Sequence, residues 1–383
     1  MSARAPLSIA LVAGEASGDR LGAELMRALA AERPGVRCFG MAGPAMRAAG
    51  CAALARSEEL SVMGLVEVVA SYPRLYRLRA RLVEAIVAAR PAALVGIDVP
   101  DFNLGLERRV KAHGIRTVHY VCPQIWAWRP GRAASLHRAA DRLLAVLPFE
   151  PEFFTRHGVA TTFVGHPLAD SLPLLPDRAA TRAALGLPAE ATLLAVMPGS
   201  RDHELARLLP DFIACARRLH ARHPALRAVF CVAHAGQLAP LAAALAAGAP
   251  ELAPHVFHGQ SHQVLTACDV ALVASGTVTL EALLCATPMV VAYRLSPISY
   301  PIIRRMVKIP HVALPNILAG EALVPELLQD AITPLALCAA IEQWLEQPLR
   351  RAAFVDTSRR LHAELRGDAA RRAARAVLES CGT

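Results

Sequence analysis

The stretch IALVAGEASGD, residues 9–19, runs from a short apolar segment through a glycine-bearing turn into a helical pattern. A strand that ends in such a turn and continues directly into a helix is typical of α/β domains, which bind ligands at the carboxyl ends of their strands. The turn has neither the G-x-G-x-x-G pattern of dinucleotide-binding domains nor the lysine of a P-loop. It therefore predicts an α/β domain with a ligand site, and argues against a dinucleotide there.

The same alternation of short apolar runs and helical patterns recurs along most of the chain. AALVGI, TVHYVC and LLAVLP follow in the first half, and TLLAVMPGS, LRAVFCVA, DVALVASGT and PMVVAY in the second. Such alternation predicts βαβ units and parallel sheets. The proline-rich stretch GHPLADSLPLLPDRAA separates the two series. We expect two Rossmann-like domains of similar size, with ligands bound in a cleft between them.

These patterns suggest domain boundaries. Residues 1–165 form the predicted N-terminal domain, residues 166–190 a linker, and residues 191–345 the C-terminal domain. Residues 346–383 are rich in alanine and arginine and read as helical. We expect this last segment to pack back on the N-terminal domain.

Composition excludes several classes of protein. The 383 residues are 54% hydrophobic and 19% charged, which argues against disorder. No uninterrupted apolar stretch reaches the roughly 20 residues of a spanning helix, and no signal peptide is visible. The net charge of +9 favours anionic partners, but no basic stripe with interleaved aromatics predicts nucleic-acid binding. Nine cysteines without a C-x-x-C pair indicate a reducing, cytoplasmic compartment.

Two motifs in the second half predict a nucleotide site. MPGSRDHE, residues 197–204, and ASGTVTLEALL, residues 274–284, each follow an apolar strand and open a helix, whose free N–H groups favour anions. Glu281 lies four residues after Thr277, so both can face one side of a helix, where a carboxylate can accept bonds from ribose hydroxyls. The alternative is that these residues cap helices or are solvated. Together they favour a nucleoside diphosphate bound by Gly199, Ser200, Arg201, Ser275, Gly276, Thr277 and Glu281.

GIDVPDFN, residues 96–103, places Asp98 at the carboxyl end of the apolar strand AALVGI. Catalytic groups gather at such strand ends, and an apolar surrounding raises the pKa of a carboxyl toward that of a general base. Asp101 is better placed to cap the helix that Pro100 introduces. The alternative for Asp98 is a turn residue bonded to the backbone.

The opening turn suits hydroxyl groups better than a strongly anionic ligand. Its glycines bring the backbone close to a ligand, while Glu15 and Asp19 are negatively charged. With the nucleotide in the other domain, the turn is left for the acceptor, and the predicted contacts are Glu15, Ser17, Gly18 and Asp19. The alternative is a tight strand–helix turn with Asp19 near the helix start.

Two further stretches have simpler interpretations. Trp126 and Trp128, in HYVCPQIWAWRPGR, are expected to pack in a core or between domains. In residues 60–82, apolar and aromatic residues precede an arginine cluster, which suits either a membrane interface or a buried amphipathic helix. By itself the pattern favours the buried helix.

The sequence predicts neither a metal nor a cofactor. It lacks the D-x-D and H-E-x-x-H motifs, and no cysteine or carboxylate completes a site with His255, His258 and His262.

Taken together, the motifs resemble those of bacterial lipid-A-disaccharide synthases, inverting glycosyltransferases of the GT-B fold. The resemblance rests on LVAGEASGD, GIDVPDFN, HYVCPQIWAWR, LPFEPEFF, VGHPLAD, MPGSR, ASGTVTLEALL, MVVAYR, LPNILAG and PELLQ, in that order. It implies transfer from UDP-2,3-diacylglucosamine to 2,3-diacylglucosamine 1-phosphate, which gives a β(1→6)-linked disaccharide 1-phosphate and UDP without a catalytic metal. It also implies a cytoplasmic protein, peripheral on the inner face of the inner membrane. A homodimer is left open.

The resemblance implies roles for individual residues. Asp98 acts as the base, Arg201 and the helix start at residues 275–277 meet the leaving group, and Glu281 holds the ribose. On resemblance alone, Asn316 and Gln329 are added as donor contacts. The acylated substrates favour the membrane interpretation of residues 60–82, with contacts from Val66, Val68, Val69, Tyr72 and Leu75. The chain departs from the family pattern at Ala16, Cys122 and Gln124, to which no polar role is assigned.

Three other functions remain as alternatives. A UDP-N-acetylglucosamine epimerase or the peptidoglycan transferase would share the nucleotide motifs, but not GIDVPDFN together with LVAGEASGD. A nucleic-acid-binding protein would need a basic binding surface. A nicotinamide-dependent dehydrogenase is disfavoured because G-x-G-x-x-G is missing.

Overall fold

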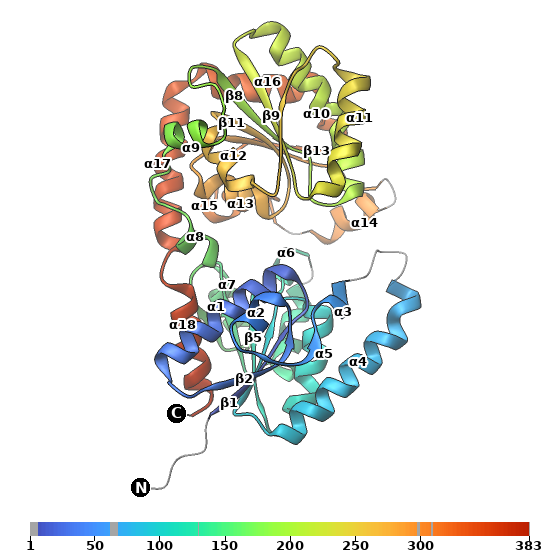
Figure 1. Cartoon of the computed structure of the whole chain (residues 1–383), viewed down its shortest axis with the longest axis vertical. Coiled ribbons are helices and arrows are strands. Elements are labelled where there is room, and N and C mark those ends of the chain that lie inside the picture. Colours follow the sequence, from blue (N-terminus) through green and yellow to red (C-terminus); the bar gives the residue numbers. More distant parts are fainter. Residues whose placement is uncertain (1–6, 62–67, 129, 297–298, 308, 383) are drawn as a thin grey trace. The chain divides into compact units, whose positions relative to one another are not determined.

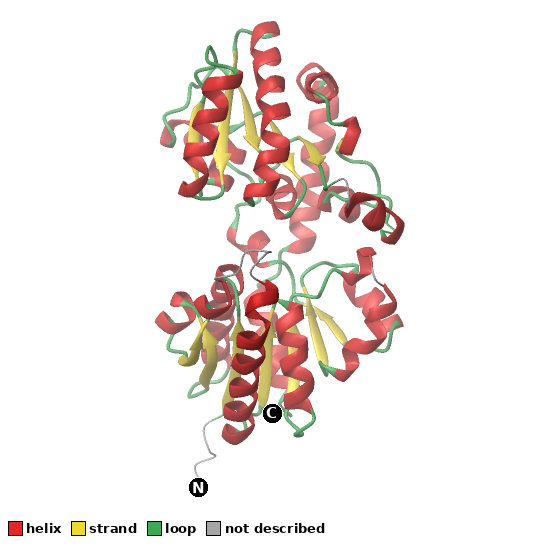
Figure 2. Cartoon of the chain, turned by 90° about the vertical axis from the view of Figure 1, so that its right-hand side faces the viewer, coloured by secondary structure: helices red, strands yellow, loops and turns green. Residues whose placement is uncertain are grey.

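The computed structural model describes residues 7–61, 68–128, 130–296, 299–307 and 309–382. The chain divides into two compact units. Unit 1 comprises Met1–Asp170 and Leu365–Thr383, and unit 2 comprises Ser171–Glu364. Each is described by itself. The α/β class predicted from the sequence is confirmed in both, because each unit is built on a parallel sheet with helices on its faces (Figure 2).

The sheet of unit 1 has the strand order β3-β2-β1-β4-β5-β6-β7, and every described pairing is parallel. Its strands are β1 (Ser8–Ala13), β2 (Arg37–Ala42), β3 (Ala52–Arg56), β4 (Ala93–Ile97), β5 (Arg116–Tyr120), β6 (Arg142–Ala145) and β7 (Thr161–Phe163). All five residues of β4 and the last five of β1 are buried. Such uniformly apolar central strands are expected where helices cover both faces of a parallel sheet.

The helices of unit 1 lie on both sides of this sheet (Figure 1). They are α1 (Ala16–Glu32), α2 (Pro44–Ala48), α3 (Glu58–Ser61), α4 (Val68–Ala89), α5 (Pro100–Lys111), α6 (Ile125–Trp128), the 3-10 helix η1 (Pro130–Arg138), α7 (Glu150–Arg156), α8 (Pro167–Ser171) and α18 (Ala369–Ser380). Helices α4 and α5 cover one core, in which Leu78, Leu82 and Ile86 pack against Val12 and Leu94.

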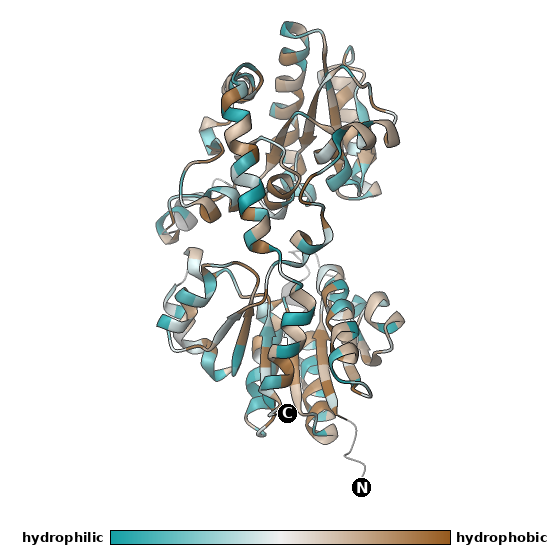
Figure 3. Cartoon of the chain, turned by 90° about the vertical axis from the view of Figure 1, so that its left-hand side faces the viewer, coloured by the Kyte–Doolittle hydropathy of each residue, from teal (hydrophilic) through white to brown (hydrophobic). Residues whose placement is uncertain are grey.

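The sheet of unit 2 has the order β10-β9-β8-β11-β12-β13, again parallel throughout the described pairings. Its strands are β8 (Thr192–Met197), β9 (Leu226–Val232), β10 (His255–His258), β11 (Val270–Ala274), β12 (Met289–Tyr293) and β13 (Glu326–Leu328). Figure 3 shows hydrophobic colour along the strands and mixed colour on the surrounding helices.

The elements around this sheet are α9 (Arg178–Ala184), α10 (Asp202–Arg222), η2 (Ala235–Gln237), α11 (Leu238–Gly248), α12 (Ser261–Ala267), α13 (Thr277–Leu284), α14 (Ser299–Met306), α15 (Leu314–Ala319), η3 (Gln329–Ala331), α16 (Pro334–Glu346) and α17 (Pro348–Leu365). Helix α17 is held to the unit by Ser358, whose hydroxyl donates to the Leu283 carbonyl at 2.7 Å.

The boundary between the units differs from the predicted linker at residues 166–190. Asp170 of α8 accepts hydrogen bonds from the backbone N–H groups of Gly367, Asp368 and Ala369, which ties this segment to the start of α18 in unit 1. Arg182 of α9 is buried in unit 2 and bonds Asp269 at 2.7 Å. The proline-rich stretch is therefore divided between two folded units, and the chain crosses from one to the other between Asp170 and Ser171.

The C-terminal segment is divided in the same way. Helix α17 lies almost wholly within unit 2, whereas α18 packs along α1 in unit 1 (Figure 1). Arg371 and Arg375 of α18 pair with Glu32 at 2.6 and 3.2 Å, and Glu379 pairs with Arg142 at 2.8 Å.

The strand order reverses direction at one point in each sheet. In unit 1 this switch point lies between β1 and β4, where Ala13 is in register with Ile97. In unit 2 it lies between β8 and β11, where Met197 is in register with Val273. Ligands of doubly wound sheets bind at the carboxyl ends of the strands beside such a point. The four turns predicted to contact substrates, after β1, β4, β8 and β11, begin there.

Within the described part of the chain, no helix combines the length and apolar character needed to cross a bilayer.

Candidate functional site

Asp98 follows the last residue of β4 and is half-buried. Its backbone N–H donates to the Tyr120 carbonyl at 2.9 Å, which extends the β4–β5 pairing by one residue. Asp98 and Val99 both adopt left-handed backbone conformations, with φ of 52° and 44°. Pro100 then begins α5, and Asp101 lies exposed in its first turn. Asp98 thus stands at the switch point of unit 1, as predicted.

Directly behind this turn lies a buried polar cluster, formed by Asn103, Glu107 and His119. Asn103 and Glu107 are four residues apart on α5, and Glu107 lies 2.8 Å from His119 Nδ1 on β5 with both side chains fully buried. A Cβ at Gly96 would come within 2.0 Å of the Glu107 carboxylate, so glycine makes room for the pair.

The sign of the charge in this cluster follows from its contacts. Burial would lower the pKa of the His119 imidazole, but the Glu107 carboxylate beside it outweighs burial and raises that pKa above its usual value. The sequence analysis did not single out this pair. One signal was available, because Asn103 and Glu107 fall within the buried stripe of α5 between Phe102, Leu106 and Val110.

The turn after β1 presents only part of its predicted contacts. Glu15 and Ser17 are exposed at the start of α1, and Gly18 packs against the Ile97 carbonyl, 3.4 Å from where its Cβ would stand. Asp19 is buried instead. Its carboxylate accepts the N–H groups of Gly43, Ala45 and Met46 at 2.8–3.0 Å. Asp19 therefore caps the start of α2, and its contact with the acceptor stays a prediction.

The first predicted phosphate-binding turn of unit 2 follows β8. Gly199 has a φ of 126° and Ser200 is exposed beyond it. The N–H groups of Ser200 and Arg201 donate to Glu204 Oε2 at 3.2 and 3.3 Å, and the Arg201 guanidinium bonds Glu204 Oε1 at 2.9 Å. A carboxylate of the chain itself thus occupies the donors predicted for phosphate, in a capping box at the start of α10.

Gln237 supports this turn and was not predicted. It is fully buried, and its amide donates to the Ser200 carbonyl at 3.2 Å while accepting the Ala233 N–H at 3.1 Å. No motif in the sequence marked it, because Ser200 lies on another loop, 37 residues earlier in the chain.

The second turn of unit 2 follows β11. Gly276 and Thr277 are exposed at the start of α13, and Ser275 donates its hydroxyl to the Val312 carbonyl at 3.4 Å. Glu281 lies one turn into α13, with His262 Nε2 of α12 at 3.3 Å. Burial would raise the pKa of Glu281, but hydrogen bonds from His262 and Ser261 lower it below its usual value. The carboxylate is ionised and 18% exposed, so it can still accept a ligand hydroxyl.

Asn316 and Gln329, the two donor contacts assigned on resemblance alone, lie in different surroundings. Asn316 is buried, and its amide bonds both the Val324 backbone and Glu326, at 2.8–2.9 Å. These bonds tie α15 to β13, and a contact of Asn316 with the donor stays a prediction. Gln329 is half-buried at the carboxyl end of β13, with a φ of 53°.

The tryptophans and the predicted membrane segment can be assigned in part. Trp126 is buried and donates to Glu150 at 3.2 Å, as expected of a core residue, whereas Trp128 is 39% exposed. Leu75 is partly buried and packs against the core of unit 1, and its membrane contact stays a prediction. Val66 lies outside the described residues, and so do the side chains of Val68, Val69 and Tyr72.

The histidines considered for a metal are dispersed. His255 and His258 lie on β10, and His262 pairs with Glu281. Among the residues that the structure describes, no three His, Cys, Asp or Glu side chains form a group that could hold a metal ion.

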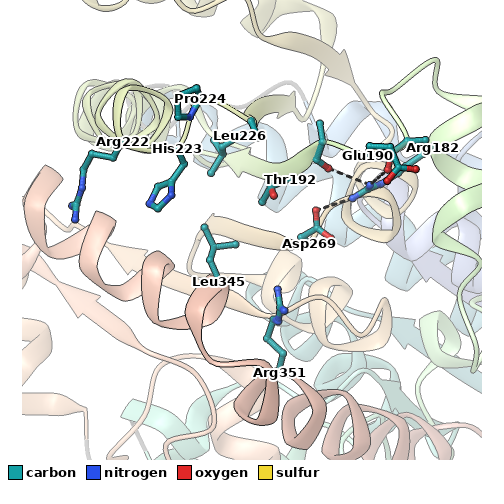
Figure 4. Close-up of a pocket in the computed structure, with 13 residues that line it drawn as sticks. Arg182, Glu190, Thr192, Arg222, His223, Pro224, Leu226, Asp269, Leu345 and Arg351 are labelled. Atoms are coloured by element: carbon teal, nitrogen blue, oxygen red, sulfur yellow. Dashed lines mark hydrogen bonds and ion pairs between the residues drawn. The ribbon is translucent and has the colours of Figure 1, made fainter.

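A pocket of about 500 Å³ in unit 2 lies away from these motifs (Figure 4). Its lining includes Thr192 and Leu226, the first residues of β8 and β9, and Asp269, which precedes β11. It therefore opens at the amino-terminal edge of the sheet. Arg182 and Asp269 already pair across its wall.

Comparison with solved structures agrees with the fold. The UDP-GlcNAc 2-epimerase of Neisseria meningitidis superposes with a TM-score of 0.61 at 9% identity, covering 97% of this chain and 98% of that one. The calicheamicin glycosyltransferase CalG4 gives 0.59 at 16% identity, covering 99% of each chain. WaaG, a glycosyltransferase of lipopolysaccharide biosynthesis, gives 0.55 at 15% identity, covering 98% and 100%. The predicted GT-B fold of two Rossmann-like domains is confirmed.

Comparison of sequences is more specific. The profile of the lipid-A-disaccharide synthetase family matches residues 9–379. The lipid-A-disaccharide synthase of Pseudomonas aeruginosa PAO1 is 49% identical over 373 residues, covering 97% of this chain and 98% of its own length. That of Sodalis glossinidius is 49% identical over 378 residues, covering 99% of each. With motifs, fold and relatives in agreement, the chain belongs to the lipid-A-disaccharide synthetase family.

Proposed function

We propose that this protein transfers 2,3-diacylglucosamine from its UDP conjugate to the 6-hydroxyl of 2,3-diacylglucosamine 1-phosphate. The products are the β(1→6)-linked disaccharide 1-phosphate and UDP. Family membership supports the reaction. The observation that carries the residue roles is that the switch point of each unit holds one part of the chemistry, a carboxylate in unit 1 and helix starts with a ribose-type carboxylate in unit 2.

The donor binds to unit 2 in this proposal. Its diphosphate lies on the N–H groups at the starts of α10 and α13, where the helix dipoles favour negative charge. The phosphate oxygens replace the Glu204 carboxylate on Ser200 and Arg201. Glu281 accepts bonds from the ribose hydroxyls, because its ionised carboxylate is accessible beside Thr277.

The acceptor binds to unit 1, where Glu15 and Ser17 are exposed beside the switch point. Asp98 removes the proton of the acceptor 6-hydroxyl. That oxygen forms a bond to the anomeric carbon of the donor as the bond to the UDP oxygen breaks, which inverts the configuration at that carbon. The negative charge that develops on UDP is stabilised by Arg201 and the α13 start, which is electrostatic stabilisation of a leaving group.

The decisive experiment is direct. The purified protein is incubated with both acylated glucosamine substrates, and mass spectrometry measures disaccharide 1-phosphate and UDP. We expect equal amounts of the two products, and no disaccharide when the acceptor is omitted. Release of UDP without disaccharide, or epimerisation of a UDP-sugar, would contradict the proposal.

We also place the protein at the inner face of the inner membrane. The acylated substrates require such a surface, and α4 exposes Arg74 and Arg77 beside Tyr76, which is 50% exposed. Each arginine near an anionic bilayer contributes about 1 kcal/mol, so the double variant Arg74→Ser/Arg77→Ser should bind vesicles containing anionic lipid about 30-fold more weakly.

The matched control is Arg359→Ser/Arg360→Ser on α17, which removes the same charge from exposed positions of unit 2. It should bind the same vesicles as the unmodified protein does. An equal loss in both variants would mean that net charge alone, and not α4, attracts the protein to the bilayer.

A further inference from the structure

The turn that carries Asp98 is strained. Asp98 and Val99 are consecutive non-glycine residues in the left-handed region, and Val99 has φ 44° and ψ 60°. This conformation is unfavourable for residues with a Cβ, and most of all for a β-branched residue such as valine. Strained backbone persists only where the surrounding structure over-determines it, and it concentrates at functional sites.

A single side chain meets the carbonyl groups around this turn. Asn103 Nδ2 lies 2.7 Å from the Asp98 carbonyl, 3.1 Å from that of Ile97 and 3.3 Å from that of Val12. Asn103 is only 1% exposed. Because Val12 belongs to β1 and Ile97 to β4, the amide joins the two central strands at the switch point as well as holding the turn.

The helix that supplies Asn103 is itself anchored. Glu107, one turn further along α5, meets His119 of β5 in the fully buried pair behind Gly96. Within the described residues, Asn103 Oδ1, Glu107 Oε2 and His119 Nε2 make no hydrogen bond. A buried polar cluster with unsatisfied atoms costs stability, which an apolar α5 face would avoid. The presence of this polar cluster is explained if it stabilises the Asp98 turn.

We propose that Asn103 is a positioning residue for Asp98: its amide holds the left-handed turn so that the Asp98 carboxylate points to the acceptor hydroxyl. This inference rests on the role proposed for Asp98. Asn103 does not touch a substrate. It acts through the Asp98 carbonyl, while the Tyr120 carbonyl holds the Asp98 N–H from the other side.

The test is a double-mutant cycle in the full-length protein, with Asn103→Ala, Asp98→Asn and their combination. We expect Asn103→Ala to lower kcat about 100-fold, because a displacement near 1 Å of a reacting group has that effect. The KM for the UDP-sugar should change little, since the donor binds elsewhere. In the Asp98→Asn background the same substitution should lower the residual turnover by less than about threefold, because it acts through a carboxylate that is already gone.

A control separates positioning from loss of stability. Thr117→Val removes another buried hydrogen bond of unit 1, from the Thr117 hydroxyl to the Ala139 carbonyl at 2.8 Å, at the opposite end of β5. It should lower the thermal midpoint and leave kcat unchanged. If Asn103→Ala does not fold, Asn103→Ser takes its place in the cycle, since it retains one donor.

The outcomes distinguish the two proposals. Near-normal turnover of Asp98→Asn alone would overturn the base assignment, and this inference with it. A different result would be that Asp98→Asn loses most of its turnover, while Asn103→Ala lowers kcat by the same factor with and without the Asp98→Asn substitution. Asn103 would then have only a structural role. In that case the positioning proposal fails and the base assignment stands.

Discussion

In each unit, the helix that follows the strand at the switch point carries a glutamate that pairs with a histidine, but the two pairs differ in burial. Glu107 and His119 of unit 1 are fully buried 2.8 Å apart. Glu281 and His262 of unit 2 lie 3.3 Å apart and remain 18% and 37% exposed. A fully buried pair can only stabilise the fold around the Asp98 turn, whereas an accessible carboxylate can also accept hydrogen bonds from a ligand. We therefore expect Glu107 to serve the structure of unit 1 and Glu281 to serve ligand recognition in unit 2.

The largest effect on turnover is expected from Asp98, which lies next to the buried Glu107–His119 pair. Asp98→Asn removes the proposed base, and general-base catalysis typically contributes 100- to 10,000-fold, so kcat should fall about 1,000-fold. UDP affinity, measured by calorimetry, should be unchanged because the proposed nucleotide site is in unit 2. The control is Asp101→Asn, an exposed carboxylate in the first turn of α5. A comparable loss of kcat in Asp98→Asn and Asp101→Asn would contradict the assignment of Asp98 as the base.

Removing the charge of Glu107 in the buried Glu107–His119 pair should lower the stability of the protein. Glu107→Gln leaves His119 buried without its charged partner, and the loss of one member of a buried pair costs about 3 kcal/mol in the free energy of unfolding. The raised pKa of His119 means that the pair stabilises fully below pH 6.5 and loses this contribution as the pH rises through the raised value. Urea unfolding should therefore show the largest difference from the unmodified protein on the acidic side.

The matched control for that experiment is a third pair. Glu342 meets His223 at 3.1 Å and Arg222 at 3.0 Å, and both partners are substantially exposed. Glu342 is itself buried, but Arg222 and His223 are 60% and 37% exposed, so Glu342→Gln leaves its partners in contact with solvent and should cost about 1 kcal/mol. Equal costs for Glu107→Gln and Glu342→Gln would show that burial does not distinguish the pairs.

Breaking the accessible pair should affect ligand binding more than stability. Glu281→Gln removes the charged acceptor for the ribose, worth about 2 kcal/mol, so UDP affinity should fall about 30-fold by calorimetry. The lowered pKa of Glu281 gives the opposite pH sign to His119, since its stabilising contribution is present above pH 4.5 and lost as the pH falls through the lowered value. Unchanged UDP affinity would show that Glu281 serves the fold as Glu107 does.

The smallest effect concerns the carboxylate on the other helix start of unit 2. In the proposed donor site, Glu204→Gln removes the charge that competes with phosphate for the Ser200 and Arg201 N–H groups. It should tighten UDP binding two- to fivefold, or about 0.4 to 1 kcal/mol. Arg201→Ala is the counterpart and should weaken UDP binding. Weaker binding in both variants would mean that Glu204 orders the turn rather than competing with the ligand.

The positions of the motifs could be predicted because they depend on local patterns. Asp98, Ser200 and Thr277 each follow an apolar strand and precede or begin a helix, and parallel sheets bring such ends to one edge. The internal partners of Asp19, Asn316 and Leu75 could not be predicted, because they lie 8 to 27 residues away or in the core that the side chain joins. A polar residue in a motif looks the same in sequence whether it meets a ligand or a backbone N–H group.

By itself, the sequence determined the α/β class, the two series of strands, the family and the turns that carry the chemistry, because hydrophobic period and short motifs are local properties. Only the tertiary structure decided which polar groups are already bonded. It assigned Asp19 to the start of α2, Glu204 to the start of α10, and the Asn103–Glu107–His119 cluster to the underside of the Asp98 turn. The reason is physical: a buried donor or acceptor must find its partner among groups that folding brings together, and those groups are distant in the sequence.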